Sequence, residues 1–304
     1  MSSQPHILSL PTEVLHQILQ PLPIPSLLAF SSTCHHAHHL ATTNLHTLSL
    51  GIRPLATPPT HNPGPYEIWL RIPKTHAYDY TTLFNFQSAL FSSILGRHGA
   101  LLQHLDLCIW ALTGPMGHAI ANLSALRTLG LRVENAAYGR ALPPRACVAL
   151  ERSEQAKAWA VLSRSAVWRE RLLCLRLENV EVGVEALAGV LAEARCCREV
   201  RLRGCRFLGR ELWGVLGSGR WAGGDSLRVL GVADCGLVLG EEAWEGIGRL
   251  GALRCLDLGD CQAVDSAMFE MFNRDVWHIP EFVPPKDVGS GDDMVIEVDP
   301  EYMS

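Results

Sequence analysis

Five residues with metal-ligand chemistry stand close together near the start of the chain. They are Cys34, His35, His36, His38 and His39. Thiolate and imidazole groups suit zinc, but a structural zinc normally takes four ligands from two separated elements, and no paired Cys or His motif follows. We therefore predict no metal site and interpret the histidines as a solvated helix face, whose charge could respond to pH near the ordinary histidine pKa of ~6.5.

Arginine recurs within short segments in which leucine or valine alternates with other residues. These are Arg132, Arg176, Arg201 and Arg203. A guanidinium group binds carboxylate and phosphate through paired hydrogen bonds, so the four arginines predict a site for an acidic or phosphorylated protein segment. The alternative is a solvated strand face of mixed charge, partly neutralised by Glu178 and Glu199.

The motifs that would indicate catalysis do not occur in the sequence. We find no Gly-x-Ser-x-Gly elbow, no Walker-type phosphate loop and no His-Glu-x-x-His metal helix. The Gly-rich stretch GSGRWAGGD lacks both the preceding strand pattern and the downstream acid of a dinucleotide site. We predict no catalytic residues and no cofactor, and a zinc-dependent hydrolase built on the histidines is the last of the hypotheses.

The arginines belong to a recurring unit, Leu-x-x-Leu-x-Leu, that must position them. Its copies are LLQHLDL, LSALRTLGL, RLLCLRL, CREVRLRGC, SLRVLGVADC and ALRCLDLGDC. Their paired apolar anchors are Leu105/Leu107, Leu129/Leu131, Leu175/Leu177, Val200/Leu202, Leu230/Val232 and Leu256/Leu258, spaced by 24, 46, 25, 30 and 26 residues. A helical pattern follows each copy, which predicts an α/β fold: a curved parallel sheet with outer helices.

Cysteine follows the second anchor by three residues in the last three copies, as Cys205, Cys235 and Cys261. A small side chain there can turn inward and hydrogen-bond neighbouring backbone. The pattern resembles the cysteine-containing leucine-rich repeats over about residues 100–265. We place a short solenoid at residues 100–272, with an insertion near residues 134–171 that is either a decayed repeat or a binding arm.

Three short helices are predicted before the repeats. Val14, Leu15, Ile18, Leu19 and Leu22 recur at helical spacing, and prolines separate this helix from two that follow. About 34 residues cannot enclose a full core, so we expect exposed apolar surface.

Residues 7–46 resemble the F-box family. The matching positions are Leu10, Pro11, Glu13, Leu15, Ile18, Leu19, Leu22, Pro23, Leu27, Leu28 and Cys34. The resemblance implies that the module binds the Skp-type adaptor of a cullin-based ubiquitin ligase. The residues that it implicates in adaptor binding are Leu10, Pro11, Val14, Leu15, Ile18, Leu19, Leu27 and Leu28.

Together, the two resemblances imply a non-enzymatic adaptor that recruits an unidentified protein substrate to the ligase. The alternative is a leucine-rich-repeat scaffold unconnected to ubiquitin, in which the N-terminal helices only cap the repeats.

Composition bounds the remaining expectations. The net charge is −5, but residues 273–304 hold eight acids against Arg274 and Lys286, a balance of −6 that leaves about +1 elsewhere. We therefore predict no nucleic-acid partner, and an acidic, disordered tail at residues 273–304.

Ten cysteines without framework spacing, no secretory leader and no long apolar run predict a cytosolic or nuclear protein without a membrane span. The F-box-like module takes residues 1–50, and residues 51–99 hold a Pro-rich linker and a first irregular repeat.

Overall fold

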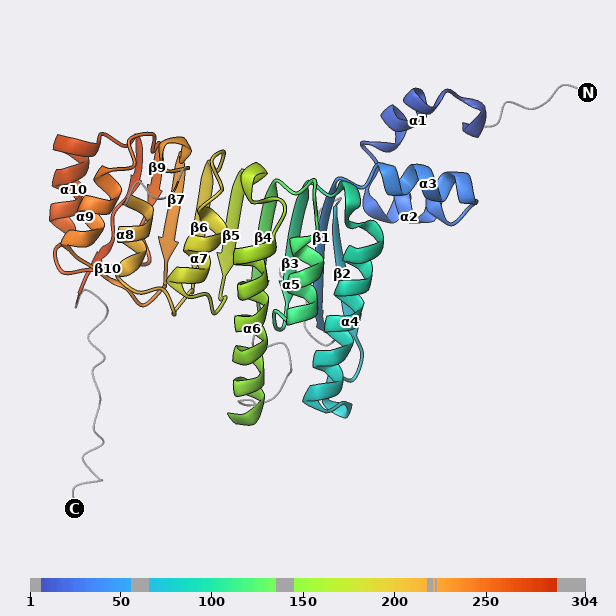
Figure 1. The fold of residues 1–304 in the computed structure, drawn as a ribbon, viewed down its shortest axis with the longest axis horizontal. Coiled ribbons are helices and arrows are strands. Elements are labelled where there is room, and N and C mark those ends of the chain that lie inside the picture. The colour runs from blue at the N-terminus through green and yellow to red at the C-terminus, as the bar shows by residue number, and fades with distance from the viewer. Residues whose placement is uncertain (1–6, 56–65, 135–144, 218–220, 222, 289–304) are drawn as a thin grey trace, which may run out of the picture.

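A computed structural model describes the chain except for residues 1–6, 56–65, 135–144, 218–220, 222 and 289–304. Helices at the N-terminus stand at one end of a long sheet, and further helices line one face of that sheet (Figure 1). The predicted fold class is confirmed: three N-terminal helices precede an α/β region whose main sheet is parallel throughout.

The N-terminal module consists of a 3-10 turn (Ile7–Ser9) and three helices. These are α1 (Thr12–Leu19), α2 (Ile24–Ser31) and α3 (His35–Thr43). Pro11 and Pro23 lie directly before α1 and α2, where a missing backbone N–H costs no intrahelical hydrogen bond. The Cys34 side chain caps α3 by accepting a hydrogen bond from the Ala37 N–H at 3.4 Å.

In the part of the chain that the structure describes, nine parallel strands form the main sheet, in the order β11-β9-β7-β6-β5-β4-β3-β1-β2. Their bounds are β1 (Thr47–Pro54), β2 (Glu67–Ile72), β3 (His104–Ile109), β4 (Thr128–Val133), β5 (Cys174–Glu178), β6 (Glu199–Arg203), β7 (Val229–Ala233), β9 (Cys255–Asp257) and β11 (Glu281–Val283). Each predicted first anchor is paired with the first anchor on the adjacent strand. In order along the sheet, these anchors are Leu105, Leu129, Leu175, Val200, Leu230 and Leu256. All are buried, so one apolar layer runs through the repeats.

Helices cover one face of this sheet and bury that layer. They are α4 (Tyr80–His98), α5 (Gly114–Ala121), α6 (Arg145–Ser165), α7 (Val184–Leu191), α8 (Glu211–Gly217), α9 (Glu241–Gly248) and α10 (Ser266–Phe272). The long segment between the anchors Leu129 and Leu175, which are 46 residues apart, contains α6. The strands on either side of it, β4 and β5, still pair directly with each other. No further strand occurs between them in the described residues.

The predicted cysteine ladder is confirmed. The Cys205, Cys235 and Cys261 side chains are buried, and each donates a hydrogen bond to a carbonyl of the preceding repeat: Leu177 at 3.7 Å, Leu202 at 3.6 Å and Val232 at 2.9 Å, respectively. The thiols therefore link each of these repeats to the preceding one, in addition to the pairing of the strands.

The turn after several strands uses left-handed backbone. Asn179, Gly204 and Asp234 directly follow β5, β6 and β7, with φ of 55°, 63° and 49°. Asn, Asp and Gly tolerate this conformation better than other residues. The repeats thus share one turn geometry despite their different lengths.

The predicted disorder from residue 273 is wrong for residues 273–288. This segment contains a π-helical turn (Asn273–Trp277), β11, and β12 (Lys286–Asp287). β12 joins a small parallel sheet with β10 (Gln262–Ala263) and β8 (Val238–Leu239). The Trp277 ring stacks on Phe272 at 5.6 Å, so aromatic packing outweighs the acidic composition. Residues 289–304 of the predicted tail lie outside the described residues.

At the other end, β1 lies between β2 and β3, and β2 forms the edge of the sheet. The boundary predicted at residue 50 falls inside β1. Ile24 of α2 joins the main hydrophobic core with Leu48, Leu50 and Ile52 of β1. The module therefore packs against the sheet as well as within itself.

Candidate functional site

The helical module has a small core of its own. Leu15 and Leu19 of α1 are buried against Leu27 of α2 and Leu40 of α3. The four-residue spacing of Leu15 and Leu19 places both on one face of α1. These residues hold the three helices together.

A second set of apolar residues on α1 and the turn before it points to solvent. We name this set the α1 stripe: Ile7, Leu10, Val14 and Ile18. Val14 and Ile18 are each 39% exposed and lie one helical turn apart, and Ile7 and Leu10 are more exposed still. An exposed, aligned apolar set of this kind marks an interaction surface more often than a random scatter does.

The structure divides the predicted adaptor-binding residues into two groups. Leu10, Pro11, Val14, Ile18 and Leu28 are exposed, whereas Leu15, Leu19 and Leu27 are buried in the module core. The placement of these three leucines on the surface is corrected. The apolar residues of α1 cover a wide arc of the helix. One part of that arc packs against α2 and α3, and the other part faces solvent.

Ile7 belongs to the exposed set but was not among the predicted residues. Its position three residues before Leu10 was the available signal. Leu28 is exposed on α2, where it borders a different hollow, described below.

The histidine cluster lies on α3. Among the described residues no group of three or more His, Cys, Asp or Glu side chains is arranged to hold a metal ion. The His38 ring instead meets the His98 ring of α4 edge-on, at 6.4 Å between centroids.

The four predicted arginines share the face of the sheet opposite the helices, which we call the open face. Arg132 of β4, Arg176 of β5 and Arg201 and Arg203 of β6 line one hollow of about 290 Å³. Because adjacent strands are in register, Arg176 lies beside Arg201. The sequence therefore placed these side chains together correctly.

Each of these arginines pairs with a carboxylate of the same face. Arg132 pairs with Glu178 at 2.8 Å, and Arg176 and Arg201 share Glu199 at 2.9 and 2.8 Å. Arg203 reaches Asp260 at 3.4 Å, and Lys286 approaches the same carboxylate at 3.6 Å. The sequence could anticipate Glu178 and Glu199, but Asp260 lies in the turn after β9 and Lys286 lies in β12, which the predicted tail did not foresee.

Two carboxyl groups show the electrostatic balance of the open face. Burial raises the pKa of Asp106, and the positive charges of Arg132 and Arg176 only partly oppose that rise. Burial would also raise the pKa of Glu199, but hydrogen bonds from Arg176 and Arg201 outweigh it and leave this pKa lowered. The face thus offers alternating charges of both signs.

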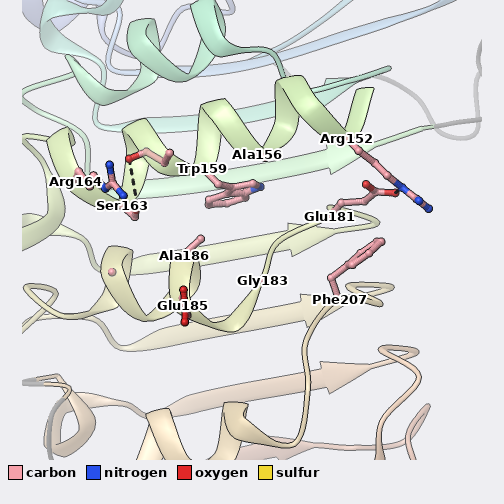
Figure 2. A pocket seen from close by; sticks show the side chains of 12 residues that line it. Arg152, Ala156, Trp159, Ser163, Arg164, Glu181, Gly183, Glu185, Ala186 and Phe207 are labelled. Carbon is pink, nitrogen blue, oxygen red and sulfur yellow. Dashed lines mark hydrogen bonds and ion pairs between the residues drawn. The ribbon is translucent and has the colours of Figure 1, made fainter. Parts of the chain in front are cut away.

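A groove of about 670 Å³ runs between α6 and α7 on the helical side (Figure 2). Arg152, Glu181 and Phe207 gather at one end of it, where the Arg152 guanidinium lies 5.5 Å from the Phe207 ring centre. Arg152 also pairs with Glu181 at 3.4 Å. The inserted helix α6 is much longer than α7, which leaves the groove open at this end.

No helix among the described residues combines the length and apolar character needed to cross a membrane. A search of curated proteins finds no match to this chain. A family model does match the N-terminal module, over residues 7–47: the F-box domain. The match covers α1 to α3 and leaves the repeats unassigned, although the long parallel sheet is consistent with a leucine-rich-repeat solenoid. The chain therefore carries an F-box domain at residues 7–47, which implies binding to a Skp-type adaptor of a cullin ligase.

Proposed function

We propose that this chain is a non-enzymatic, substrate-recruiting adaptor of a cullin-based ubiquitin ligase. The F-box domain would dock the Skp-type adaptor through the α1 stripe, and the repeats would hold a protein target. The observation that carries the proposal is the combination of a matched F-box domain with an apolar stripe that its own small core leaves exposed.

Co-purification of the full chain with the Skp-type adaptor tests the docking step. We expect wild type to retain the adaptor and the triple variant Leu10→Asp, Val14→Asp, Ile18→Asp to lose it, because three charges would have to be buried in the interface. These positions are exposed, so the variant should still fold. Val264→Asp, at a position 75% exposed on the solenoid, is the matched control.

A scaffold capped by the helices is the second candidate, and one contact favours it. Ile24 of the module is part of the solenoid core, as a capping element requires. In that case, folded wild-type protein would capture no adaptor, and the triple variant would behave in the same way.

We further propose that the target lies on the open face. Its arginines are already paired with carboxylates, so a purely acidic segment would have to displace Glu178 and Glu199. A segment carrying both signs of charge could exchange partners with these ion pairs without leaving charges unpaired.

Reversing the four arginines to glutamate tests this surface. Partner recovery in a pull-down should fall sharply for the variant if the target binds there. Undiminished recovery by the folded variant would rule out the open face as the target surface. If the wild-type chain bound an acidic peptide but not a peptide of mixed charge, the target would instead be an acidic or phosphorylated segment.

A further inference from the structure

An apolar pocket lies where the F-box domain meets the sheet. We call it the junction pocket; its walls come from α2, α3, β1, β2 and α4, and its volume is about 240 Å³. Leu27 of α2 and Leu48 and Leu50 of β1 line it as buried side chains, with Ile24 beside them. It is distinct from both the α1 stripe and the open face.

Ten of the fourteen residues that line the pocket are aliphatic, so water in most of it would find few hydrogen-bonding partners. An engineered cavity of ~150 Å³ with comparable apolar walls in another protein stays dry and binds benzene. The junction pocket is larger. At about 30 Å³ per heavy atom, the volume of one water in the liquid, it has room for roughly eight heavy atoms. The seven alkyl carbons of octanoate would fit there while its carboxylate lies at the rim, where His38 is exposed and His98 half-buried.

The polar groups of the pocket include two imidazoles, His38 of α3 and His98 of α4, whose rings meet edge-on at 6.4 Å. Ser31 and Thr42 are the other polar side chains in its lining, and no acidic residue is among the residues that form it. A charged group on a ligand held here would therefore be anionic.

Histidine charge at this site is set by a few neighbours. Burial lowers the pKa of His98, and the nearby His38 and Arg97 lower it further. From α2, β1 and β2 the pocket receives aliphatic side chains and Ser31 only. A bound carboxylate would reverse this balance by favouring the protonated imidazole.

We propose that the junction pocket binds a medium-chain aliphatic carboxylic acid, with the chain among the leucines and isoleucines and the carboxylate at His38 and His98. Such a ligand would contact the F-box domain and the repeats at once and would stabilise their junction. This activity is separate from the proposed ligase function and does not depend on it.

Isothermal titration calorimetry of the full chain with octanoate and 1-octanol tests the proposal. Each methylene that enters the pocket should raise affinity about fourfold between butanoate and octanoate. Octanoate should bind about three- to tenfold more tightly at pH 5.5 than at pH 8, because imidazolium pairs with carboxylate. Octanol should show no such pH dependence.

Two variants locate the site. In His38→Gln, His98→Gln the pH dependence for octanoate should disappear while octanol affinity stays within about twofold. Leu70→Trp, on the edge strand, should block both ligands by filling the pocket. Absence of saturable octanoate binding to folded wild type, or octanoate binding with the same pH dependence in the double variant, would overturn the proposal.

Discussion

At the scale of single residues, the open face is a set of mutually paired charges. The Glu199 carboxylate accepts hydrogen bonds from both Arg176 and Arg201. In the same way, the Asp260 carboxylate forms ion pairs with both Arg203 and Lys286. Solvent-exposed pairs of this kind contribute little to folding, typically below about 1 kcal/mol. These ion pairs are therefore expected to add little to the stability of the fold.

The variant Glu199→Gln tests that reading. Its free energy of unfolding at pH 7 should fall by less than about 1 kcal/mol. Because the pKa of Glu199 is lowered in the folded state, its contribution is present above the unfolded pKa of about 4.5 and is lost as pH falls below it. Urea unfolding of both proteins at pH 7 and pH 3.5 should show the difference shrinking at the lower pH; a constant difference would contradict the assignment.

Thiol reactivity provides a second residue-scale prediction. Burial raises the pKa of Cys174 to about 11 and of Cys197 and Cys261 to about 12, whereas Cys34 and Cys196 are exposed. The thiolate is the reactive form, so iodoacetamide at pH 8 should label Cys34 and Cys196 first. Peptide mapping by mass spectrometry checks the order, and early labelling of Cys261 in the folded protein would show that the ladder opens.

At the scale of elements, α1 carries apolar residues on two adjacent sides with different roles. One side, with Leu15, builds the module, and the other, with Ile18, faces solvent. Helical spacing in the sequence identifies both sides but does not say which is covered, since that depends on where α2 and α3 pack. For this reason, the sequence located the module but did not separate its core leucines from its exposed apolar residues.

A matched pair of truncations separates the two roles. Leu15→Ala should destabilise the module by about 2–5 kcal/mol, because it leaves a cavity in a core of few residues. Ile18→Ala should change stability by about 0.5 kcal/mol or less. Hydrogen exchange of residues 12–43 reports both, and equal protection in the two variants would mean that the assignment of faces is wrong.

The turns between repeats make a second element-scale prediction. Gly204 has a φ of 63°, and a Cβ there would lie 2.1 Å from the Asn179 Oδ1 atom. Gly204→Ala should therefore cost more than about 1 kcal/mol. Gly214, inside α8 with nothing within 4 Å, is the control, and alanine there should stabilise by about 0.5–1 kcal/mol. Thermal unfolding of the two variants should show shifts of opposite sign.

At the scale of the whole molecule, a solenoid must close its two ends. The F-box domain and β2 cover one end, and an aromatic group of Trp244, Phe269, Phe272 and Trp277 covers the other, together with β11. The repeat anchors in the sequence predicted the stacked strands well, because the same alternation of apolar residues recurs in each copy even where the spacing between copies changes. The C-terminal cap escaped prediction because a few aromatic residues order a segment whose charge and proline content indicate disorder.

Trp277→Ala tests the importance of that cap. Because Trp277 is half-buried, loss of its stacking on Phe272 should destabilise the last repeats by about 1–3 kcal/mol and expose the edge of β9. Size-exclusion chromatography should then show association on warming, which Val288→Ala, at an exposed position, should not cause. A variant that stays monomeric with an unchanged melting temperature would show that β11 alone protects this end.

The position of β1 bears on how the molecule carries load. Only residues 44–46 separate α3 from β1, and β1 pairs with β2 on one side and β3 on the other. A pull on the F-box domain along the strand would have to shear two hydrogen-bonded ladders at once, whereas an edge strand could peel away one bond at a time. The strand order β3-β1-β2 thus makes the link between the F-box domain and the repeats resistant to force applied along the strand.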